Sequence, residues 1–201
     1  MENKKIGVDI DEVLASLIHE LTNFYNSIYK TNFSFEDYHT YDLEDTWGGT
    51  KERSVKIVDN FYSSLFFRNI KPIDGSQKSI KVLSGKHDLI AITSRPNFMQ
   101  RETESWIEKY FPRQIKKIIC TGQYFLKQNK ISKSDVCLEE NAHIIIEDNY
   151  QTAFDCSKNG LVSFLLNKPW NKNSLSGNGV VRVNSWKEIL EKIKLLEIER
   201  C

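Results

Sequence analysis

The sequence predicts an α/β fold, a doubly wound parallel sheet with a small helical cap inserted after the first strand. Three observations support this prediction. Short β-branched runs alternate with amphipathic helical stretches along most of the 201 residues, which is typical of parallel strands joined by helices. One long stretch near the N-terminus breaks the alternation and is rich in aromatic residues. Acidic or hydroxyl side chains follow several strand-like runs, where an open parallel sheet binds its ligands.

The first predicted unit is a strand followed by a helix. The run "KKIGVDI" is β-branched and ends among acidic residues, which favours a buried strand. From Val13 onward, apolar residues recur every three or four positions, and this spacing predicts an amphipathic helix. The apolar positions of that helix are Leu14, Leu17, Ile18, Leu21, Phe24, Tyr25 and Ile28.

A second series of alternating elements begins near Asp74. Gly85 and Pro112 are expected to end two of its helices. The stretch "NKPWNKNSLSGNG" is rich in Asn, Gly and Ser and is predicted to be a loop. In chain order we expect a helix in "SQKSIKVLSG", a strand in "DLIAITS", a helix in "FMQRETESWIEKYF", a strand in "IKKIICT", a helix in "SKSDVCLEE", a strand in "HIIIED", a helix over about 151–160, a strand in "LVSFLL" and a final helix from Trp186.

Between the first strand and "DLIAITS" lie far more residues than one crossover helix needs. Residues 15–74 hold 12 of the 23 aromatic residues in under a third of the chain. Such enrichment suggests that these residues form a helical cap with its own core, since aromatic side chains bury large apolar areas. We therefore expect residues 15–74 to form the cap, and residues 1–14 and 75–201 to form the α/β core domain.

Composition limits the classes of partner. The chain has 28 basic and 27 acidic residues and a net charge of +1, so no broad field attracts it to a nucleic acid polymer or an anionic membrane. Its four cysteines show no CxxC pair, which favours reduced thiols. The N-terminus lacks the features of a signal peptide, and no run is long enough to span a membrane. We expect a cytoplasmic protein that handles a small molecule.

Polar side chains gather at the ends of three predicted strands. Pairs of carboxylates at two strand ends would repel each other unless a cation lay between them, and Mg²⁺ suits a few carboxylates together with a phosphate. A threonine hydroxyl and a lysine from "KQNKISK" are groups that hold phosphate. The strand-end residues are Asp9 and Asp11, Thr93 and Ser94, and Glu147 and Asp148.

The order of these groups resembles the four motifs of the haloacid dehalogenase-like phosphohydrolases, which have a Rossmann-like sheet. A DxD comes first, then a threonine, a later lysine and an acidic pair. The stretches "FFRNIKPIDGS", "TSRP" and "IIEDN", with a helical insertion after the first motif, are more narrowly similar to the 5′(3′)-deoxyribonucleotidases, the group of the cytosolic type C 5′-nucleotidase. The resemblance covers nearly the whole chain, although only the four motifs are specific.

The resemblance implies a role for each matching residue. Asp9 matches the nucleophile that forms an aspartyl-phosphate, and Asp11 matches the general acid that later activates water. Thr93, with Ser94 beside it, matches the phosphate donor, and Lys133 matches the cation that neutralises nucleophile and phosphate. The metal ligands would be Asp148, the Asp9 carboxylate and the Asp11 backbone carbonyl, with Mg²⁺ as the cofactor and Glu147 in support.

Several assignments remain open. Lys127 and Lys130 compete with Lys133, which we prefer because Ser132 can cap the following helix. Arg95 is assigned to substrate binding, but pairing with an acid is an equal alternative. Glu12 replaces the small residue that many relatives have after the second aspartate, and it could face solvent or perturb the site.

The cap is expected to decide specificity. Most of its aromatics should be core, whereas Trp47, Phe61 and Phe66 are weak candidates for stacking on a nucleobase. We expect a Mg²⁺-dependent phosphomonoesterase that acts on a nucleoside monophosphate, preferably a deoxyribonucleotide, with a homodimer left open. The alternatives are a phosphatase for another small phosphomonoester and a non-enzymatic phospho-accepting or metal-binding module, although receiver domains carry their acceptor aspartate on a later strand.

Overall fold

A six-stranded parallel sheet organises the protein, in a computed structural model that describes residues 3–122, 131–174, 177 and 179–198. The strand order is β3-β2-β1-β4-β5-β6 and every neighbouring pair is parallel, which confirms the predicted doubly wound sheet. The order reverses between β1 and β4. The strands are β1 Lys5–Val8, β2 Asp88–Thr93, β3 Lys117–Cys120, β4 Ile144–Glu147, β5 Val162–Leu166 and β6 Val180–Val183.

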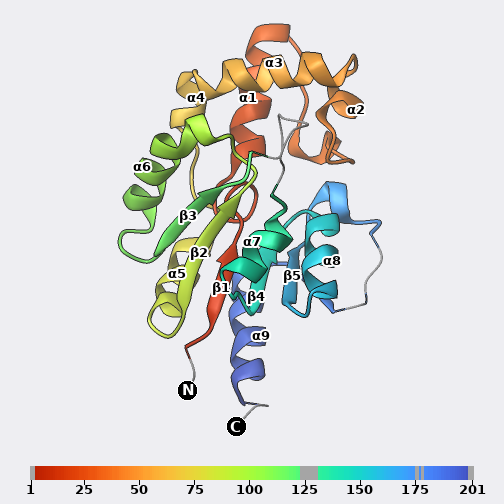
Figure 1. The fold of residues 1–201 in the computed structure, drawn as a ribbon. Helices are drawn as coiled ribbons and strands as arrows, with labels where there is room; N and C mark the ends of the chain where they lie inside the picture. Colours follow the sequence, from red (N-terminus) through yellow and green to blue (C-terminus); the bar gives the residue numbers. More distant parts are fainter. Residues whose placement is uncertain (1–2, 123–130, 175–176, 178, 199–201) are drawn as a thin grey trace.

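Helices cover both faces of the sheet (Figure 1). Alternate residues of β1 and β2 point to opposite sides, as the pleat of a strand requires. Ile6 and Leu89 pack in the cluster that includes α5 and α9, whereas Ile90 packs in the cluster that includes α7 and α8. The helices of the core are α5 Ser76–Ser84, α6 Gln100–Tyr110, α7 Lys133–Glu139, α8 Tyr150–Lys158 and α9 Trp186–Ile198.

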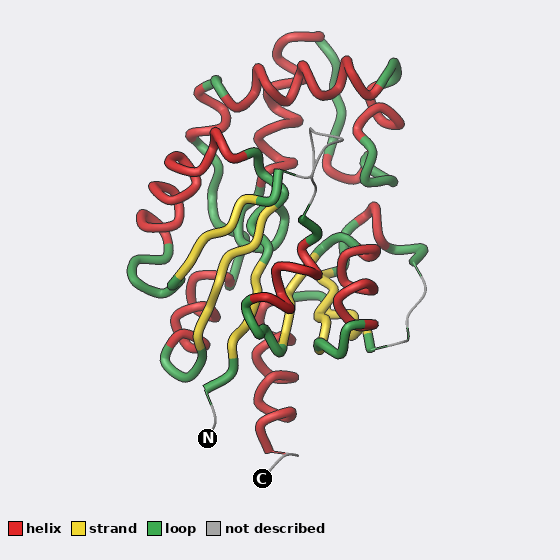
Figure 2. The backbone as a smooth tube through the Cα atoms, viewed as in Figure 1, coloured by secondary structure: helices red, strands yellow, loops and turns green. Residues whose placement is uncertain are grey.

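Residues 15–74, the cap, lie over the carboxyl ends of the strands (Figures 1 and 2). Their regular structure is helical: α1 Leu17–Tyr29, α2 Leu43–Trp47, α3 Lys51–Tyr62, α4 Leu65–Arg68 and the 3₁₀ turn η1 Phe35–Asp37. The two connections to the core run side by side, with Ser16 N donating to Lys71 O at 2.9 Å and Ile73 N donating to Leu14 O at 2.8 Å.

The buried side chains of the cap and of the sheet form one contiguous cluster. Phe61 and Tyr38 of the cap belong to the same cluster as Ile6 and Ile146 of the strands. The cap therefore packs directly on the core instead of enclosing a separate one. The division of the chain at residues 15 and 74 stays a prediction.

One helix boundary and one strand differ from the sequence prediction. Helix α1 begins at Leu17 and not near Val13, because a tight turn precedes it. In this turn Leu14 N and Ala15 N both donate to Ile10 O at 2.8 Å, and Glu12 has a φ of 61°. The sequence also missed β6, since a four-residue strand beside a Gly- and Asn-rich stretch gives little periodic signal.

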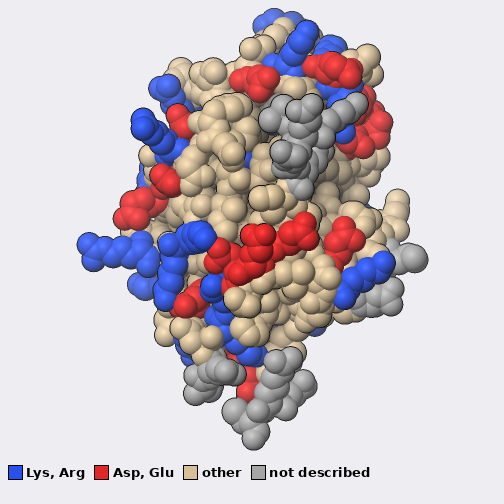
Figure 3. Space-filling view, in the orientation of Figure 1, with Lys and Arg blue, Asp and Glu red and all other residues tan. Residues whose placement is uncertain are grey.

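Charge is mixed on the face seen in Figure 3, where basic and acidic side chains both occur and neither sign covers the surface. This pattern agrees with the net charge of +1. Within the described ranges, none of the helices has the length and apolar character needed to cross a membrane.

Candidate active site

The predicted strand-end residues meet at one edge of the sheet, where the strand order reverses. Val8 of β1 lies in register with Ala91 of β2 and with Ile146 of β4. Asp9 follows β1 directly, and its backbone N–H donates to Ile146 O at 3.0 Å. Because Thr93 ends β2, the acidic and hydroxyl side chains of three neighbouring strands lie at the same edge. This is where ligands of doubly wound sheets bind.

Lys133 enters this edge from the first turn of α7. Its side chain is 3% exposed, although lysine is rarely buried without a partner. Ser132 caps the helix, with its hydroxyl accepting from Asp135 N at 3.0 Å, as the sequence suggested. The competing Lys127 and Lys130 lie outside the described residues.

Two carboxylates hold the Lys133 ammonium. Asp9 Oδ1 lies 2.7 Å from Lys133 Nζ, and Glu147 Oε1 also accepts a hydrogen bond from it. The second oxygen of Glu147 accepts from the backbone N–H groups of Asp148 and Asn149, both at 3.0 Å. Protein donors therefore occupy both oxygens of Glu147, which fits a supporting position better than direct ligation of a metal.

Asp148 has one occupied and one free oxygen. Its Oδ2 accepts from Trp170 Nε1 at 2.9 Å. Its Oδ1 is buried and has no hydrogen-bond partner within the described part of the chain. Asp9, Glu147 and Asp148 each place a carboxylate oxygen within 4.8 Å of the others. A buried oxygen without a partner, beside two further carboxylates, fits a hard divalent cation.

The electrostatics of the cluster also fit a cation. Burial raises the pKa of Asp9 to about 7; the Glu147 carboxylate adds to the rise and Lys133 opposes it. Burial likewise raises the pKa of Asp148 well above its ordinary value, and Glu147 and Asp9 raise it further. Without a cation, these buried carboxylates are therefore hard to ionise together.

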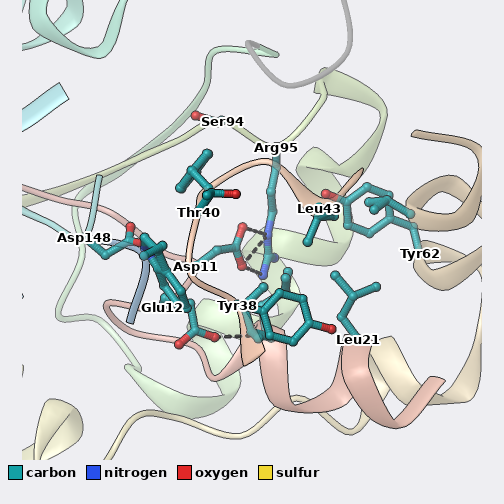
Figure 4. A pocket seen from close by; sticks show the side chains of 15 residues that line it. Asp11, Glu12, Leu21, Tyr38, Thr40, Leu43, Tyr62, Ser94, Arg95 and Asp148 are labelled. Carbon is teal, nitrogen blue, oxygen red and sulfur yellow. Dashed lines mark hydrogen bonds and ion pairs between the residues drawn. The ribbon is translucent and has the colours of Figure 1, made fainter. Parts of the chain in front are cut away.

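Asp11 is held by Arg95 (Figure 4). Arg95 Nε lies 3.2 Å from Oδ1 and 3.0 Å from Oδ2 of Asp11, and Nη2 lies 2.6 Å from Oδ1. Arg95 Nη1 donates to Thr103 Oγ1 at 3.2 Å, and its Cζ lies 5.1 Å from the centre of the Phe67 ring. These contacts favour the acid-pairing alternative for Arg95. Its assignment to substrate binding stays a prediction.

Thr93 and Ser94 lie beside this ion pair. Thr93 is fully buried, and its hydroxyl accepts from the Arg95 backbone N–H at 3.2 Å. Ser94 lines the pocket seen in Figure 4. Both lie at the edge of the sheet that carries Asp9, and their contact with phosphate stays a prediction.

Glu12 is buried, so the expectation that it could face solvent is wrong. Its side chain joins two segments instead: Oε2 lies 3.0 Å from Lys168 Nζ, and Oε1 accepts from Ile18 N in the first turn of α1 at 2.7 Å. Burial raises the pKa of Glu12, and Lys168 opposes the rise. Glu12, which directly follows Asp11, therefore connects the start of the cap to the core.

An apolar pocket lies between the cap and the edge of the sheet that carries the predicted site residues (Figure 4). Asp11, Ser94, Arg95 and Asp148 line the end near the strands. The remainder is mostly apolar and aromatic, formed by Leu17, Ile18, Leu21, Tyr38, Tyr41, Leu43, Val58, Tyr62 and Trp170, with Thr40 and Glu12.

The three stacking candidates from the sequence do not line this pocket. Trp47 stacks on Tyr25, with ring centres 4.4 Å apart, and donates from Nε1 to Tyr38 at 3.1 Å. Phe61 is fully buried, and Phe66 packs edge to face on Phe24 at 5.8 Å. Helical spacing identifies rings on an apolar face, but it does not show which rings reach the rim of a cleft.

Sequence reasoning did not single out any of the four aromatic residues that line the pocket, Tyr38, Tyr41, Tyr62 and Trp170. Tyr41 comes from the loop before α2, and Trp170 comes from the 3₁₀ turn η3 Pro169–Asn171. The signal for Trp170 was present, since "NKPW" directly follows β5 at the ligand-binding edge of the sheet. It was overlooked because the stretch is loop-like in composition.

The chain is similar to known nucleotidases over nearly its whole length. A sequence profile of the family described as 5′ nucleotidase, deoxy (pyrimidine), cytosolic type C protein matches residues 3–197. A 5′(3′)-deoxyribonucleotidase of Bacillus subtilis (strain 168) is 26% identical over 197 residues, covering 94% of this chain and 98% of that protein. A nucleotidase of Clostridium acetobutylicum is 23% identical over 189 residues, covering 94% and 93%.

Solved structures show the same fold. The crystal structure of a predicted phosphatase from Clostridium acetobutylicum superposes with a TM-score of 0.70 at 16% identity, covering 96% of this chain and 99% of that one. A haloacid dehalogenase-like hydrolase from Streptococcus pneumoniae gives 0.69 at 11% identity, covering 95% and 98%. The non-enzymatic alternative is thereby set aside. The chain belongs to the family of the cytosolic type C 5′-nucleotidase, deoxy (pyrimidine), and is a phosphoric monoester hydrolase with the haloacid dehalogenase-like fold.

Proposed function

We propose that the protein is a Mg²⁺-dependent phosphomonoesterase that hydrolyses a nucleoside monophosphate, preferably a deoxyribonucleotide, through an aspartyl-phosphate on Asp9. One observation carries the proposal: the buried Asp9 carboxylate lies 2.7 Å from Lys133 and within 4.8 Å of a carboxylate oxygen of Asp148, which itself lines an apolar pocket. The names of the related proteins support the choice of a nucleotide.

The metal would be held by the Asp9 and Asp148 carboxylates and by the backbone carbonyl of Asp11. Mg²⁺ is typically bound by one or two carboxylates together with substrate phosphate. When bound, it neutralises the nucleophile and the phosphoryl oxygens, so that the two anions can approach each other. Glu147 supports this arrangement by fixing Lys133 and the backbone at Asp148.

Asp9 and Asp11 share the chemistry. An oxygen of Asp9 attacks phosphorus, the phosphorus–oxygen bond of the ester breaks, and the bonding electron pair leaves on the ester oxygen, which takes a proton from Asp11. Water then attacks the phosphorus of the aspartyl-phosphate and gives a proton to the Asp11 carboxylate. The bond from Asp9 to phosphorus breaks and inorganic phosphate is released.

Other residues of the edge hold the transferred group. Lys133 offsets its negative charge, and the hydroxyls of Thr93 and Ser94 donate hydrogen bonds to its oxygens. Lys133 is already placed between Asp9 and Glu147, so it requires no large movement. Arg95 holds Asp11 at the end of the pocket near the strands, where a leaving group would lie.

The pocket favours a nucleoside as the leaving group. Its walls carry Tyr41, Tyr62 and Trp170 together with leucine and valine side chains. A nucleobase can bury its faces against such rings, whereas a sugar phosphate would leave them without apolar contact. On this reading residues 15–74 act as a specificity cap, and the enzyme works on small molecules in the cytoplasm. A homodimer stays a prediction.

A substrate panel tests the proposal. Deoxyribonucleoside and ribonucleoside monophosphates, phosphorylated at the 5′ or the 3′ position, would be compared with sugar phosphates and 4-nitrophenyl phosphate. The expected result is Mg²⁺-dependent release of phosphate, fastest from a deoxyribonucleotide, abolished by chelator and by Asp9→Asn. Faster turnover of a sugar phosphate would instead identify a phosphatase for another small phosphomonoester.

A further inference from the structure

The indole of Trp170 donates a hydrogen bond to the carboxylate of Asp148. We propose that Trp170 is a positioning residue that leaves Asp148 a single oxygen for the metal and thereby makes the site prefer Mg²⁺ over the larger Ca²⁺. This inference rests on the assignment of Asp148 as a metal ligand in the proposed function. It assigns a role to a residue of the loop after β5, outside the four motifs.

The two oxygens of Asp148 have different surroundings. Oδ2 accepts from Trp170 Nε1 at 2.9 Å, whereas the buried Oδ1 has no partner among the residues that the structure describes. Asp148 is 2% exposed, so water does not readily replace either contact. An indole N–H only donates and cannot ligate a metal. With Oδ2 held in this way, Asp148 has one oxygen left to offer towards Asp9.

The loop that carries Trp170 is fixed by hydrogen bonds. Asn171 Nδ2 donates to the backbone oxygens of Asp148 at 2.7 Å and of Leu166 at 2.9 Å. Arg182 donates to the backbone oxygen of Asn171 and, at 2.8 Å, to that of Ser174. Asn171 is 1% exposed. The indole therefore projects from a rigid support on β4, β5 and β6.

The cap holds the other side of the indole. The ring of Phe35, in η1, lies edge to face with that of Trp170 at 5.4 Å and 65°. Lys168 Nζ lies 5.6 Å from the centre of the Phe35 ring and also pairs with Glu12. Trp170 is thus placed between the metal ligand and the cap, and its orientation depends on both.

A carboxylate limited to one oxygen favours the smaller cation. Mg²⁺ requires near-octahedral geometry and few protein ligands, whereas Ca²⁺ takes six to eight oxygens and accepts carboxylates in bidentate mode. The N–H of Trp170 blocks that bidentate mode at Asp148. Removing the N–H frees Oδ2, so the site should lose affinity for Mg²⁺ and gain relative affinity for Ca²⁺.

Calorimetric titration of Trp170→Phe with Mg²⁺ alone and with Ca²⁺ alone tests the inference. We expect the Kd for Mg²⁺ to rise about tenfold or more, the size of effect typical for residues that orient a metal ligand. The Kd for Ca²⁺ should rise less, so that the preference shifts towards Ca²⁺. Unchanged Kd values, or an equal rise for both cations, would overturn the proposal.

Trp106→Phe is the matched control. Trp106 is also buried, and its Nε1 donates to Ile70 O at 3.0 Å, away from Asp148. The control loses the same kind of hydrogen bond, so its Tm should fall while both Kd values stay within about twofold of wild type, a difference of about 0.4 kcal/mol. A shift in cation preference in Trp106→Phe as well would show a general effect of lost stability and would overturn the proposal.

Two further variants keep the result decisive. If Trp170→Phe does not fold, Phe35→Leu leaves the indole in place but removes the ring that orients it, and it should shift the cation preference in the same direction by a smaller factor. An unchanged cation preference in Phe35→Leu would then overturn the proposal.

Asp148→Ala should lose Mg²⁺ binding. Wild-type Mg²⁺ binding in Asp148→Ala would refute the metal assignment of the proposed function. If Asp148→Ala loses Mg²⁺ binding but the Kd values of Trp170→Phe are unchanged, only this inference is refuted.

Discussion

The metal-free protein should lose stability as the pH rises from 5 to 8. Three buried carboxylates, Asp9, Glu147 and Asp148, share one buried ammonium, that of Lys133. Burial and the neighbouring Glu147 raise the pKa of Asp9 from its ordinary 3.8 to about 7. In the absence of a cation, the folded protein therefore retains a proton that the unfolded chain has already released.

Proton linkage gives the sign and the size of this change in the free energy of unfolding. Between pH 3.8 and about 7 the unfolded state binds fewer protons at Asp9 than the folded state, so the free energy of unfolding falls as pH rises. Each pH unit corresponds to about 1.4 kcal/mol, so the interval from pH 5 to 7 gives a loss of up to about 3 kcal/mol. Asp148, whose pKa is also raised, adds in the same direction.

Other shifted groups do not reverse this slope. The pKa of Lys133 is raised above its ordinary 10.5, mainly because Asp9 and Glu147 outweigh burial, so its charge is constant in this range. A hydrogen bond from Lys116 lowers the pKa of Asp88, and one from Lys117 lowers that of Glu140. The stability that such acids contribute is lost only as pH falls through their lowered pKa, below this window.

Urea unfolding in chelator at pH 5, 6, 7 and 8, followed by circular dichroism, measures the effect. Adding Mg²⁺ should remove the slope, because the cation replaces the proton. Asp148→Asn is the matched variant: it removes one charge while its amide oxygen can still accept from Trp170, so it should be more stable than wild type in chelator at pH 8. Asp148→Asn should also show a shallower slope, because the contribution of Asp148 is removed while that of Asp9 stays. A wild-type stability that rises with pH in chelator would refute the reasoning, and the same slope in Asp148→Asn would refute the contribution of Asp148.

Two more predictions concern the acid–base residue and the pocket. Asp11→Asn should lower nucleotide turnover about 10²-fold or more, because proton transfer is lost. It should also destabilise the fold by up to about 3–5 kcal/mol, since Arg95 is left buried without a counter-charge. Wild-type turnover would contradict the first role of Asp11, and an unchanged urea midpoint would contradict the second. Tyr41→Ala should lower kcat/KM for the nucleotide by the equivalent of about 1–3 kcal/mol, while its turnover of 4-nitrophenyl phosphate and its Tm stay unchanged. Phe61→Ala should instead lower stability by about 3–5 kcal/mol. Equal losses on both substrates in Tyr41→Ala would place that ring outside the leaving-group site.

The sheet and the catalytic edge could be predicted because both depend on local signals. Alternating strand and helix patterns determined the layers, and parallel topology brings the carboxyl ends of neighbouring strands together. The resemblance to the four motifs indicated a lysine in this stretch, and the capping preference of Ser132 favoured Lys133, which the structure places 2.7 Å from Asp9. The inferences about the sheet and its edge required only the spacing of residues within one element and one rule of topology.

Contacts between distant segments could not be predicted. The pairing of Arg95 with Asp11 joins residues 84 positions apart, and the bond from Trp170 to Asp148 depends on how the loop after β5 folds back. The choice of pocket aromatics failed for the same reason. Phe61 and Tyr41 both belong to an aromatic-rich segment, but only packing shows that the first is in the core and the second at the pocket.

The most direct test of the central claim is to detect the phosphoryl group on Asp9 during turnover. The enzyme would be mixed with a deoxyribonucleoside monophosphate and Mg²⁺, quenched in acid within one turnover, and treated with borohydride, which reduces an aspartyl-phosphate to homoserine. Peptide mass spectrometry should then find homoserine at position 9 in the wild type and at no position in Asp9→Asn. Turnover without modification at position 9, or modification of another residue in its place, would contradict the account.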